Sequence, residues 1–271
     1  MPTTRIAPTP SGYLHPGNLA NFLLNARLTG PAGRCYLRID DLDRARFRPA
    51  YLADIFRIVK ALNVPITDGP VDATDFAANW SQTVRLPEYH AALDRLRHHE
   101  RLFACACSRR ELQSGDHPRG CRDHRPPLDA PDVTWRVDTR GLAPVRIPDA
   151  VSGQIHTVDL HATMPDFALR RRDGHPAYQL TCVVDDLLFG IDTVGRGTDL
   201  LPSTAAQCLV SDLLGYPSLT GRITFVHHPL LTGPDGEKLS KSAGAASAPL
   251  DLTTELVAEL QTIVTQWLAP V

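Results

Sequence analysis

The chain has 271 residues, of which 43% are hydrophobic and 21% charged, a balance typical of a soluble globular protein with a sizeable core. Its formal net charge of −2 gives no overall basic signal for nucleic-acid binding. Arginines cluster at 109–125 and 170–172, where they are either solvated surface charges or part of an RNA-facing surface. No apolar run approaches membrane-spanning length and the first residues lack a signal peptide's apolar core, so we expect a cytoplasmic protein without a membrane partner.

Residues 5–18 form a proline- and glycine-rich turn between a short apolar segment and a helical pattern. Asn18 is a good N-cap and apolar residues after it recur on one face, so we expect a helix to begin there. Its free N–H groups and positive dipole end would face an anion, and His15 precedes them by one tight turn, where an imidazole can donate to a phosphate oxygen. Taken alone, the same turn fits an ordinary capped loop.

Residues 35–39 indicate a short buried strand, which completes a strand, helix, strand unit and favours a parallel sheet. Asp40, Asp41 and Asp43 follow at the carboxyl end of that strand, where ligands bind in open α/β sheets. Asp41 and Asp43 also suit capping of the next helix, so Asp40 is the stronger site candidate. We expect residues 63–88 to be a loop-rich surface connection with little function of its own.

The cysteines at 105, 107 and 121 predict a metal site. Cys105 and Cys107 cannot easily close a disulfide on themselves, and with Cys121 they converge as zinc ligands do. The fourth ligand should be a histidine, either His117 or His124. Four protein ligands leave no open position, so such a zinc would be structural. The alternative is three reduced core cysteines.

The second half of the chain predicts short strands over 133–158, a return to the main sheet at 166–170 and a helix over 176–186. The next strand ends at Arg196, whose planar guanidinium can make two parallel bonds to a carboxylate. That carboxylate belongs either to a ligand or to the protein itself, in which case it is Asp199 or Asp186. A strongly amphipathic helix reaching Trp267 ends the chain.

A second phosphate-seeking stretch, Glu237 to Ser242, follows the turn at residues 233–236. Here the chain resembles the class I aminoacyl-tRNA synthetases, whose signatures read His-Ile-Gly-His near the start and Lys-Met-Ser-Lys-Ser near the end. In this sequence they stand as His15-Pro-Gly-Asn18 and Lys238-Leu-Ser-Lys-Ser242. The opening at 5–12, the run Leu37-Arg-Ile-Asp-Asp-Leu-Asp43 and the stretch from Tyr178 to Asp186 resemble the glutamyl branch of that family, over roughly residues 5–245.

The resemblance implies an α/β fold, a Rossmann-like doubly wound parallel sheet with a zinc-containing insertion and a short C-terminal helical part. The implied divisions are a first catalytic half at 1–100, a zinc-binding insertion at 101–165, a second catalytic half with the lysine loop at 166–245, and a C-terminal helix at 246–271. Relatives in the family carry a Tyr where His117 stands, which favours His117 over His124 as the fourth ligand beside Cys105, Cys107 and Cys121.

It also implies the chemistry: attack of an amino-acid carboxylate on the α-phosphate of ATP, accompanied by Mg²⁺, and acyl transfer to a hydroxyl. The implied catalytic residues are His15, Lys238 and Lys241, and the nucleotide would contact His15, Gly17, Asn18, Lys238, Ser240 and Lys241. The amino acid would contact Arg5, Ala7, Thr9, Ser11, Asp40, Tyr178 and Arg196. Asp40 replaces a family Glu that meets the α-amino group, and Thr9 and Cys182 also depart from the family pattern.

A complete glutamyl-tRNA synthetase continues with a helical anticodon-binding region, which is not seen here. The resemblance therefore implies transfer of L-glutamate to the queuosine base in the anticodon loop of tRNA(Asp). One alternative is a paralogue that makes the adenylate of another amino acid for a pathway without tRNA. Another is a catalytically silent RNA-binding module, against which the lysine loop argues.

Overall fold

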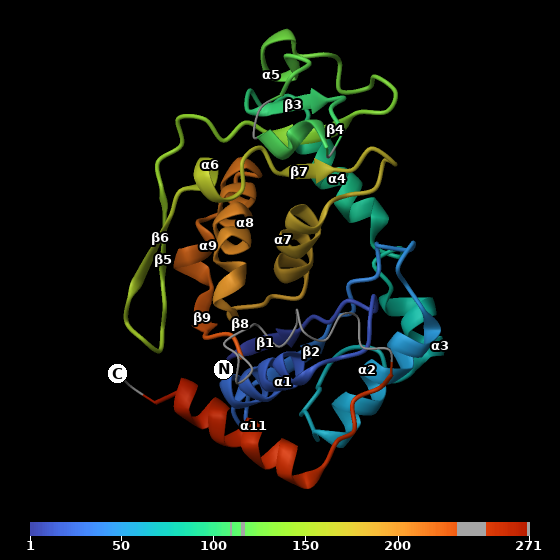
Figure 1. Ribbon diagram of the computed structural model, residues 1–271, viewed down its shortest axis with the longest axis vertical. Coiled ribbons are helices and arrows are strands. Elements are labelled where there is room, and N and C mark those ends of the chain that lie inside the picture. Colours follow the sequence, from blue (N-terminus) through green and yellow to red (C-terminus); the bar gives the residue numbers. More distant parts are fainter. Residues whose placement is uncertain (109, 115–116, 232–247, 270–271) are drawn as a thin grey trace.

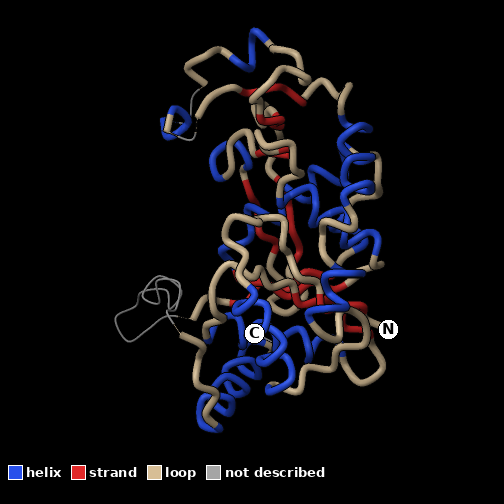
Figure 2. Tube along the Cα trace, turned by 90° about the vertical axis from the view of Figure 1, so that its right-hand side faces the viewer, coloured by secondary structure: helices blue, strands red, loops and turns tan. Residues whose placement is uncertain are grey.

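The computed structural model describes residues 1–108, 110–114, 117–231 and 248–269. The molecule is elongated, with β3, β4 and α5 at one end and α11 at the other (Figures 1 and 2). Its strands are β1 (Thr3–Ile6), β2 (Arg34–Leu37), β3 (Leu102–Cys105), β4 (Thr134–Val137), β5 (Val145–Pro148), β6 (Ile155–Val158), β7 (Ala168–Arg170), β8 (Thr193–Gly197) and β9 (Thr224–His228). Its longer helices are α1 (Pro16–Thr29), α2 (Pro49–Ala61), α4 (Leu86–Leu96), α7 (Tyr178–Leu188), α8 (Leu201–Leu213) and α11 (Thr254–Trp267). Short helical turns are α3 (Ala73–Asp75), η1 (Phe76–Trp80), η2 (Glu111–Ser114), α5 (Cys121–His124), α6 (Leu160–Thr163), η3 (Thr198–Leu200) and α9 (Leu219–Arg222).

Two pairs of strands are parallel, as the strand, helix, strand pattern predicts. β1 pairs with β2 in parallel, and β8 pairs with β9 in parallel. The Asp192 N–H donates to the Thr3 carbonyl at 3.0 Å, and the Thr3 N–H donates to the Asp192 carboxylate at 2.8 Å, so β8 starts beside β1. The pair β1 and β2 is therefore joined to the pair β8 and β9 through the contact between β1 and β8. Ligands of α/β sheets bind at this kind of place.

Helix α1 begins two residues earlier than expected. Pro16 occupies its first turn, where a missing N–H costs nothing, and His15 rather than Asn18 is the N-cap. The expectation that Asn18 caps the helix is wrong, because its side chain accepts from the backbone N–H of His15 at 3.1 Å and completes a reciprocal capping box. Leu260 and Val264 of α11 lie in the same buried cluster as Leu19 of α1, so the last helix covers the first.

A second sheet, β3-β4-β7, is antiparallel. The expectation that residues 166–170 return the chain to the main sheet is wrong, because β7 pairs with β4. The reason is a polar anchor: Asp166 binds the backbone N–H and hydroxyl of Thr139, both at 3.1 Å, and holds β7 beside the end of β4.

Residues 63–88 are more than a surface connection. They contain α3 and the single π-helical segment η1, followed by Ser81, Gln82 and Arg85, which are 4%, 2% and 7% exposed. These buried polar side chains carry contacts to the centre of the molecule, described below, so the expectation of an idle loop is wrong.

β5 and β6 form an antiparallel hairpin that packs against β9. Asp149, just after β5, accepts the backbone N–H of His227 at 2.6 Å, and the Ala150 N–H donates to the Phe225 carbonyl at 2.9 Å. The hairpin is thus tied to the sheet by one backbone bond and one bond to the Asp149 side chain. No helix in the described ranges is both long and apolar enough to cross a membrane.

Candidate active site

A cavity of about 220 Å³ opens between the carboxyl ends of β1 and β8 and the start of α1. It is lined by seven of the ten described residues proposed from the sequence to contact the amino acid or the nucleotide. The lining residues include Arg5, Ala7, Pro8, His15, Gly17, Asn18, Asn21, Phe22, Tyr178, Gly195, Arg196, Gly197, Asp199, Leu200, His228, Leu230 and Leu231. Thr9, Ser11 and Asp40, three further expected substrate contacts, are not among them.

The start of α1 is closed by its own cap. The N–H of Gly17 donates to Nδ1 of His15 at 3.1 Å, and the N–H of Asn18 donates to the His15 carbonyl at 2.8 Å. The expected free N–H groups are therefore occupied at these two positions. Because Nδ1 accepts, a neutral His15 ring carries its proton on Nε2.

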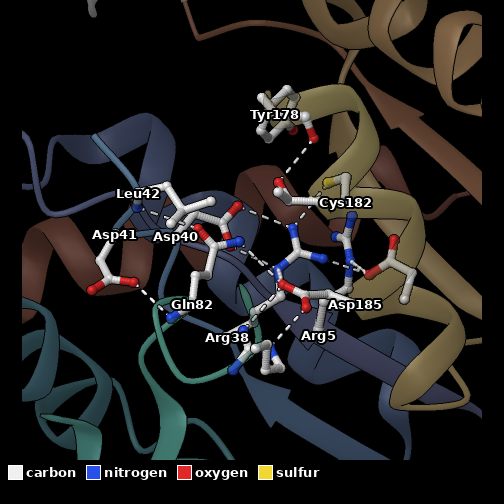
Figure 3. A network of polar contacts seen from close by, with 12 residues as sticks. Arg5, Arg38, Asp40, Asp41, Leu42, Gln82, Tyr178, Cys182 and Asp185 are labelled. Atoms are coloured by element: carbon white, nitrogen blue, oxygen red, sulfur yellow. Dashed lines mark hydrogen bonds and ion pairs between the residues drawn. The ribbon is translucent and has the colours of Figure 1, made fainter. Parts of the chain in front are cut away.

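Arg38 lies at the centre of a buried polar network beside the cavity (Figure 3). It binds both oxygens of Asp40, at 2.8 and 3.0 Å, and its Nη1 reaches Asp186 at 2.7 Å. Its Nη2 also lies 3.0 Å from Sγ of Cys182. Arg5 donates to the same Asp186 oxygen at 3.1 Å. The residue matching the family's amino-group ligand is thus held by a neighbouring arginine.

Burial and ion pairing act in opposite directions in this network. Burial raises the pKa of Asp40, and the adjacent Arg38 only partly offsets it. For Asp186 burial acts the same way, but Arg5 and Arg38 outweigh it and lower the pKa. Two arginines therefore keep Asp186 ionised.

A second group of contacts joins the 81–89 segment to α7. Arg85 donates to both oxygens of Asp185, at 2.8 and 3.1 Å, and the Tyr89 hydroxyl donates to it at 2.7 Å. The Gln82 side-chain amide donates to Asp185 at 3.1 Å, and the Gln82 backbone N–H donates to the Asp41 carboxylate at 2.8 Å. Because Asp185 and Asp186 are adjacent on α7, this segment also supports Asp186, the partner of the cavity-lining Arg5.

Arg196 has a different environment from the other buried arginines. It is 3% exposed and donates to Gln207 at 2.8 Å and to the Thr204 hydroxyl at 3.3 Å. Its Nε has no partner, and within the described ranges no carboxylate lies within 4.0 Å of its guanidinium nitrogens. Neither expected protein partner, Asp186 or Asp199, forms that ion pair here. Burial and the charge of Arg5 lower the pKa of Arg196.

Several cavity residues carried no expectation from the sequence. Asn21 donates to the Gly195 carbonyl at 3.0 Å and lies 3.2 Å from Nε2 of His228, whose ring stacks on Trp267 with centroids 4.2 Å apart. Arg38 belongs to a stretch that the family resemblance covers, so alignment of that stretch is the signal that could have found it. His228 and Asn21 have no such local signal, because their roles come from tertiary packing.

The nucleotide contacts expected at Lys238, Ser240 and Lys241 lie outside the described residues. Of the other expected positions, the structure brings together Arg5, Ala7, His15, Gly17, Asn18, Tyr178 and Arg196 at one cavity. Tyr178, at the first position of α7, is 43% exposed at its rim.

The structure also brings together Cys105, Cys107, His117 and Cys121, with their ligand atoms within 4.8 Å of one another. Sγ of Cys105 lies 3.2 Å from Nδ1 of His117, and the Cys107 and Cys121 sulfurs are 3.7 Å apart. The other His117 nitrogen lies 3.0 Å from Asp166. A carboxylate behind a histidine is the usual support of a metal ligand. His124 is exposed and outside this group.

Comparison with known proteins identifies the family of this chain. The family model described as "tRNA synthetases class I (E and Q), catalytic domain" matches residues 2–257. The chain belongs to this family. It is therefore a class I synthetase-like ligase with the α/β catalytic fold of that family.

Individual relatives agree with this class I assignment. The chain is 36% identical to the glutamyl-Q tRNA(Asp) synthetase of Pseudomonas syringae pv. tomato, over 93% of this chain and 81% of that one. It is 34% identical to the enzyme of the same name from Ralstonia nicotianae, over 94% and 83%. Among solved structures, the glutamate-tRNA synthetase of Elizabethkingia anophelis superposes with a TM-score of 0.74 at 22% identity. That match covers 92% of this class I chain but only 54% of the solved one, so the chain spans about half of that structure.

Proposed function

We propose that the protein activates L-glutamate with ATP and transfers it to the queuosine base of tRNA(Asp). The support is the group of relatives named glutamyl-Q tRNA(Asp) synthetase, which match along nearly the whole chain. The observation that carries the proposal in the structure is Arg196, a buried cation at the cavity without a carboxylate partner among the described residues.

Arg196 would bind the side-chain carboxylate of glutamate. A guanidinium offers two parallel donors to a carboxylate, and this one still has an unpartnered Nε. Thr204 and Gln207 hold its Nη1 side in place, so the ligand need not order the side chain itself. A buried guanidinium without a carboxylate partner contributes to specificity, because an amino acid that lacks a side-chain carboxylate leaves the guanidinium unpaired.

The α-amino group of glutamate would lie toward Asp40, with Arg5 and Tyr178 as further contacts of the amino acid. Asp40 already accepts two bonds from Arg38, and Asp186 carries two arginines, so the amino group would add to a charge-balanced cluster. Ala7, Thr9 and Ser11 belong to the same loop, of which Ala7 lines the cavity. We expect the loop to bring Thr9 and Ser11 closer when substrate binds.

ATP would lie along the start of α1 with His15, Gly17 and Asn18. Since Nδ1 of His15 is engaged by Gly17, its Nε2–H is the group that would donate to a phosphate oxygen. Lys238, Ser240 and Lys241 would approach the phosphates from the other side. Magnesium would accompany ATP, and the protein's part is to position the carboxylate and to neutralise charge developing on the phosphates.

Cys105, Cys107, His117 and Cys121 would bind zinc. Three thiolates and one imidazole are a common tetrahedral zinc set, and the His117 ring is oriented by Asp166. Zinc there would fix the loops around α5 against β3. The proposed divisions remain 1–100, 101–165, 166–245 and 246–271, with the qualification that β7 of the third extends the sheet of the second.

For the RNA, we propose that the anticodon loop of tRNA(Asp) enters the cavity directly, steered by arginines near the cysteine cluster. Two of these are already paired within the protein, Arg119 with Glu111 and Arg122 with Asp166. Arg172 and the remaining basic side chains would contribute most to phosphate contacts, an effect that weakens with salt.

The test offers labelled glutamate and ATP with tRNA(Asp) that carries either queuosine or guanosine at the wobble position. Labelling of the queuosine form alone supports the proposal. Amino-acid-dependent pyrophosphate exchange across all twenty amino acids, with and without tRNA, runs beside it. Robust exchange with another amino acid and no labelled tRNA would instead identify an adenylate-forming paralogue of a tRNA-independent pathway.

A further inference from the structure

Three metal-ligating side chains meet outside both the cavity and the cysteine cluster. Asp149 follows β5, His156 lies on β6 and His227 lies on β9, and their ligand atoms are all within 4.8 Å of one another. The side chains of His227 and Asp149 are 0% and 3% exposed. The hairpin and the parallel sheet thus meet at one group of ligands, of which Asp149 and His227 are buried.

The hydrogen bonds of Thr204 favour one position for the ring proton of His227. The Thr204 hydroxyl has one proton, which it donates to the Leu200 carbonyl at 3.1 Å. With the hydroxyl proton on the Leu200 carbonyl, the Thr204 oxygen accepts from Nε2 of His227, 3.0 Å away, as it accepts from Arg196. In this arrangement Nε2 carries the ring proton, and Nδ1 of the neutral ring presents a lone pair.

That lone pair faces another acceptor. Nδ1 of His227 lies 3.6 Å from Oδ2 of Asp149, and within the described part of the chain it has no hydrogen-bond partner. Two acceptors that face each other in a buried site repel unless a cation lies between them. Ligand atoms around tetrahedral zinc, at about 2.0–2.2 Å from the metal, are separated by about 3.3–3.5 Å, close to the observed distance.

The surroundings of both side chains resemble the support of metal ligands. Oδ1 of Asp149 accepts the backbone N–H groups of Val151 and Ser152 at 3.1 and 2.9 Å, which fixes the carboxylate. Thr204 fixes the opposite nitrogen of His227. A purely turn-forming role explains Oδ1 of Asp149, but it gives no reason for the orphaned Nδ1 of His227.

We propose that Asp149, His156 and His227 bind a divalent cation of the zinc class. The cation joins the β5–β6 hairpin to β9, and three protein ligands leave its fourth position for water. His227 is hydrogen-bonded to Thr204, which in turn contacts Arg196, so the site also steadies the wall of the cavity. This site is independent of the proposed aminoacylation and of the cysteine cluster.

The test counts zinc in three full-length proteins after equilibration with zinc and removal of the free ion. His156→Ala removes the partly exposed ligand, and His90→Ala, an exposed histidine on α4, is the matched control. We expect the wild type and His90→Ala to hold about one zinc per chain more than His156→Ala. Equal zinc contents in all three proteins would overturn the proposal.

A second measurement on the wild type guards against misfolding of the variant. The ¹⁵N signal of His227 Nδ1 is followed by NMR while zinc is added to metal-free protein. A large change of that signal, with Nε2 still protonated, supports coordination through Nδ1. A signal that zinc leaves unmoved would refute the site, whatever the zinc content of His156→Ala.

Discussion

Replacing Arg196 with Met separates binding of the substrate from stability of the fold. Arg196 is 3% exposed and has no carboxylate within 4.0 Å among the described residues, so the free protein gains little from its charge. Met retains an unbranched apolar side chain. Loss of the bond to Gln207, 2.8 Å long, costs about 1 kcal/mol, and relief of a buried unpaired charge offsets it. We expect the free energy of unfolding of Arg196→Met to stay within about 2 kcal/mol of wild type.

Binding of glutamate should respond in the opposite way. Removal of one partner of a buried, hydrogen-bonded charge pair costs about 2–5 kcal/mol, which corresponds to a factor of about 30 to more than 10³. The KM for glutamate in ATP–pyrophosphate exchange should rise by that factor. Urea unfolding of the same preparations gives the stability.

Arg85→Met is the matched control, since Arg85 is also buried but binds both oxygens of Asp185 at 2.8 and 3.1 Å. Its loss removes the bidentate partner of a buried carboxylate, which among the described residues keeps only Arg38 at 3.9 Å as a cation, and should cost about 3–5 kcal/mol of stability. If Arg196→Met is destabilised as much as Arg85→Met and its KM for glutamate is unchanged, Arg196 is a structural residue and the reasoning fails.

Three further changes test other parts of the molecule. Lys241→Ala should lower pyrophosphate exchange by at least about 10²-fold while the thermal melt is unchanged, and near wild-type exchange would remove Lys241 from its role. His117→Ala should lose the zinc of the cysteine cluster in metal analysis, whereas His124→Ala keeps it; the reverse result would exchange the two assignments. Burial raises the pKa of Asp186, but Arg5 and Arg38 outweigh burial and lower that pKa. The ionised carboxylate therefore stabilises the fold above the unfolded-state pKa of about 4. This contribution is lost as pH falls through the lower folded-state pKa. Asp186→Asn should therefore flatten the acid side of a plot of urea midpoint against pH, and an unchanged slope would contradict the pairing.

Local patterns predicted the parts of the site that are close in sequence. The strand, turn and helix around His15 follow from proline, glycine and apolar spacing, and the convergence of Cys105, Cys107 and Cys121 follows from a short loop. The predicted N-cap of α1 was wrong because His15 and Asn18 can both cap a helix, and only the path of the backbone decides between them.

Pairings between distant residues could not be predicted in this way. Arg85 and Asp185 are 100 positions apart, and Asp149 and His227 are 78 apart. Nothing in their local sequence distinguishes them from surface charges or turn residues. Their partners depend on how the sheets and helices pack, which is also why the segment at 63–88 was mistaken for an idle connection.

The contact between α11 and α1 determines when this protein can complete its fold during synthesis. Leu260 and Val264 cover α1, yet about 225 residues separate the end of α1 at Thr29 from the start of α11 at Thr254. At about 5–20 residues per second, a ribosome leaves that face of α1 uncovered for roughly 11–45 s. Every nascent chain thus exposes an apolar face for many times longer than a helix needs to form. The first half of the catalytic sheet is made first but is among the last parts to be sealed.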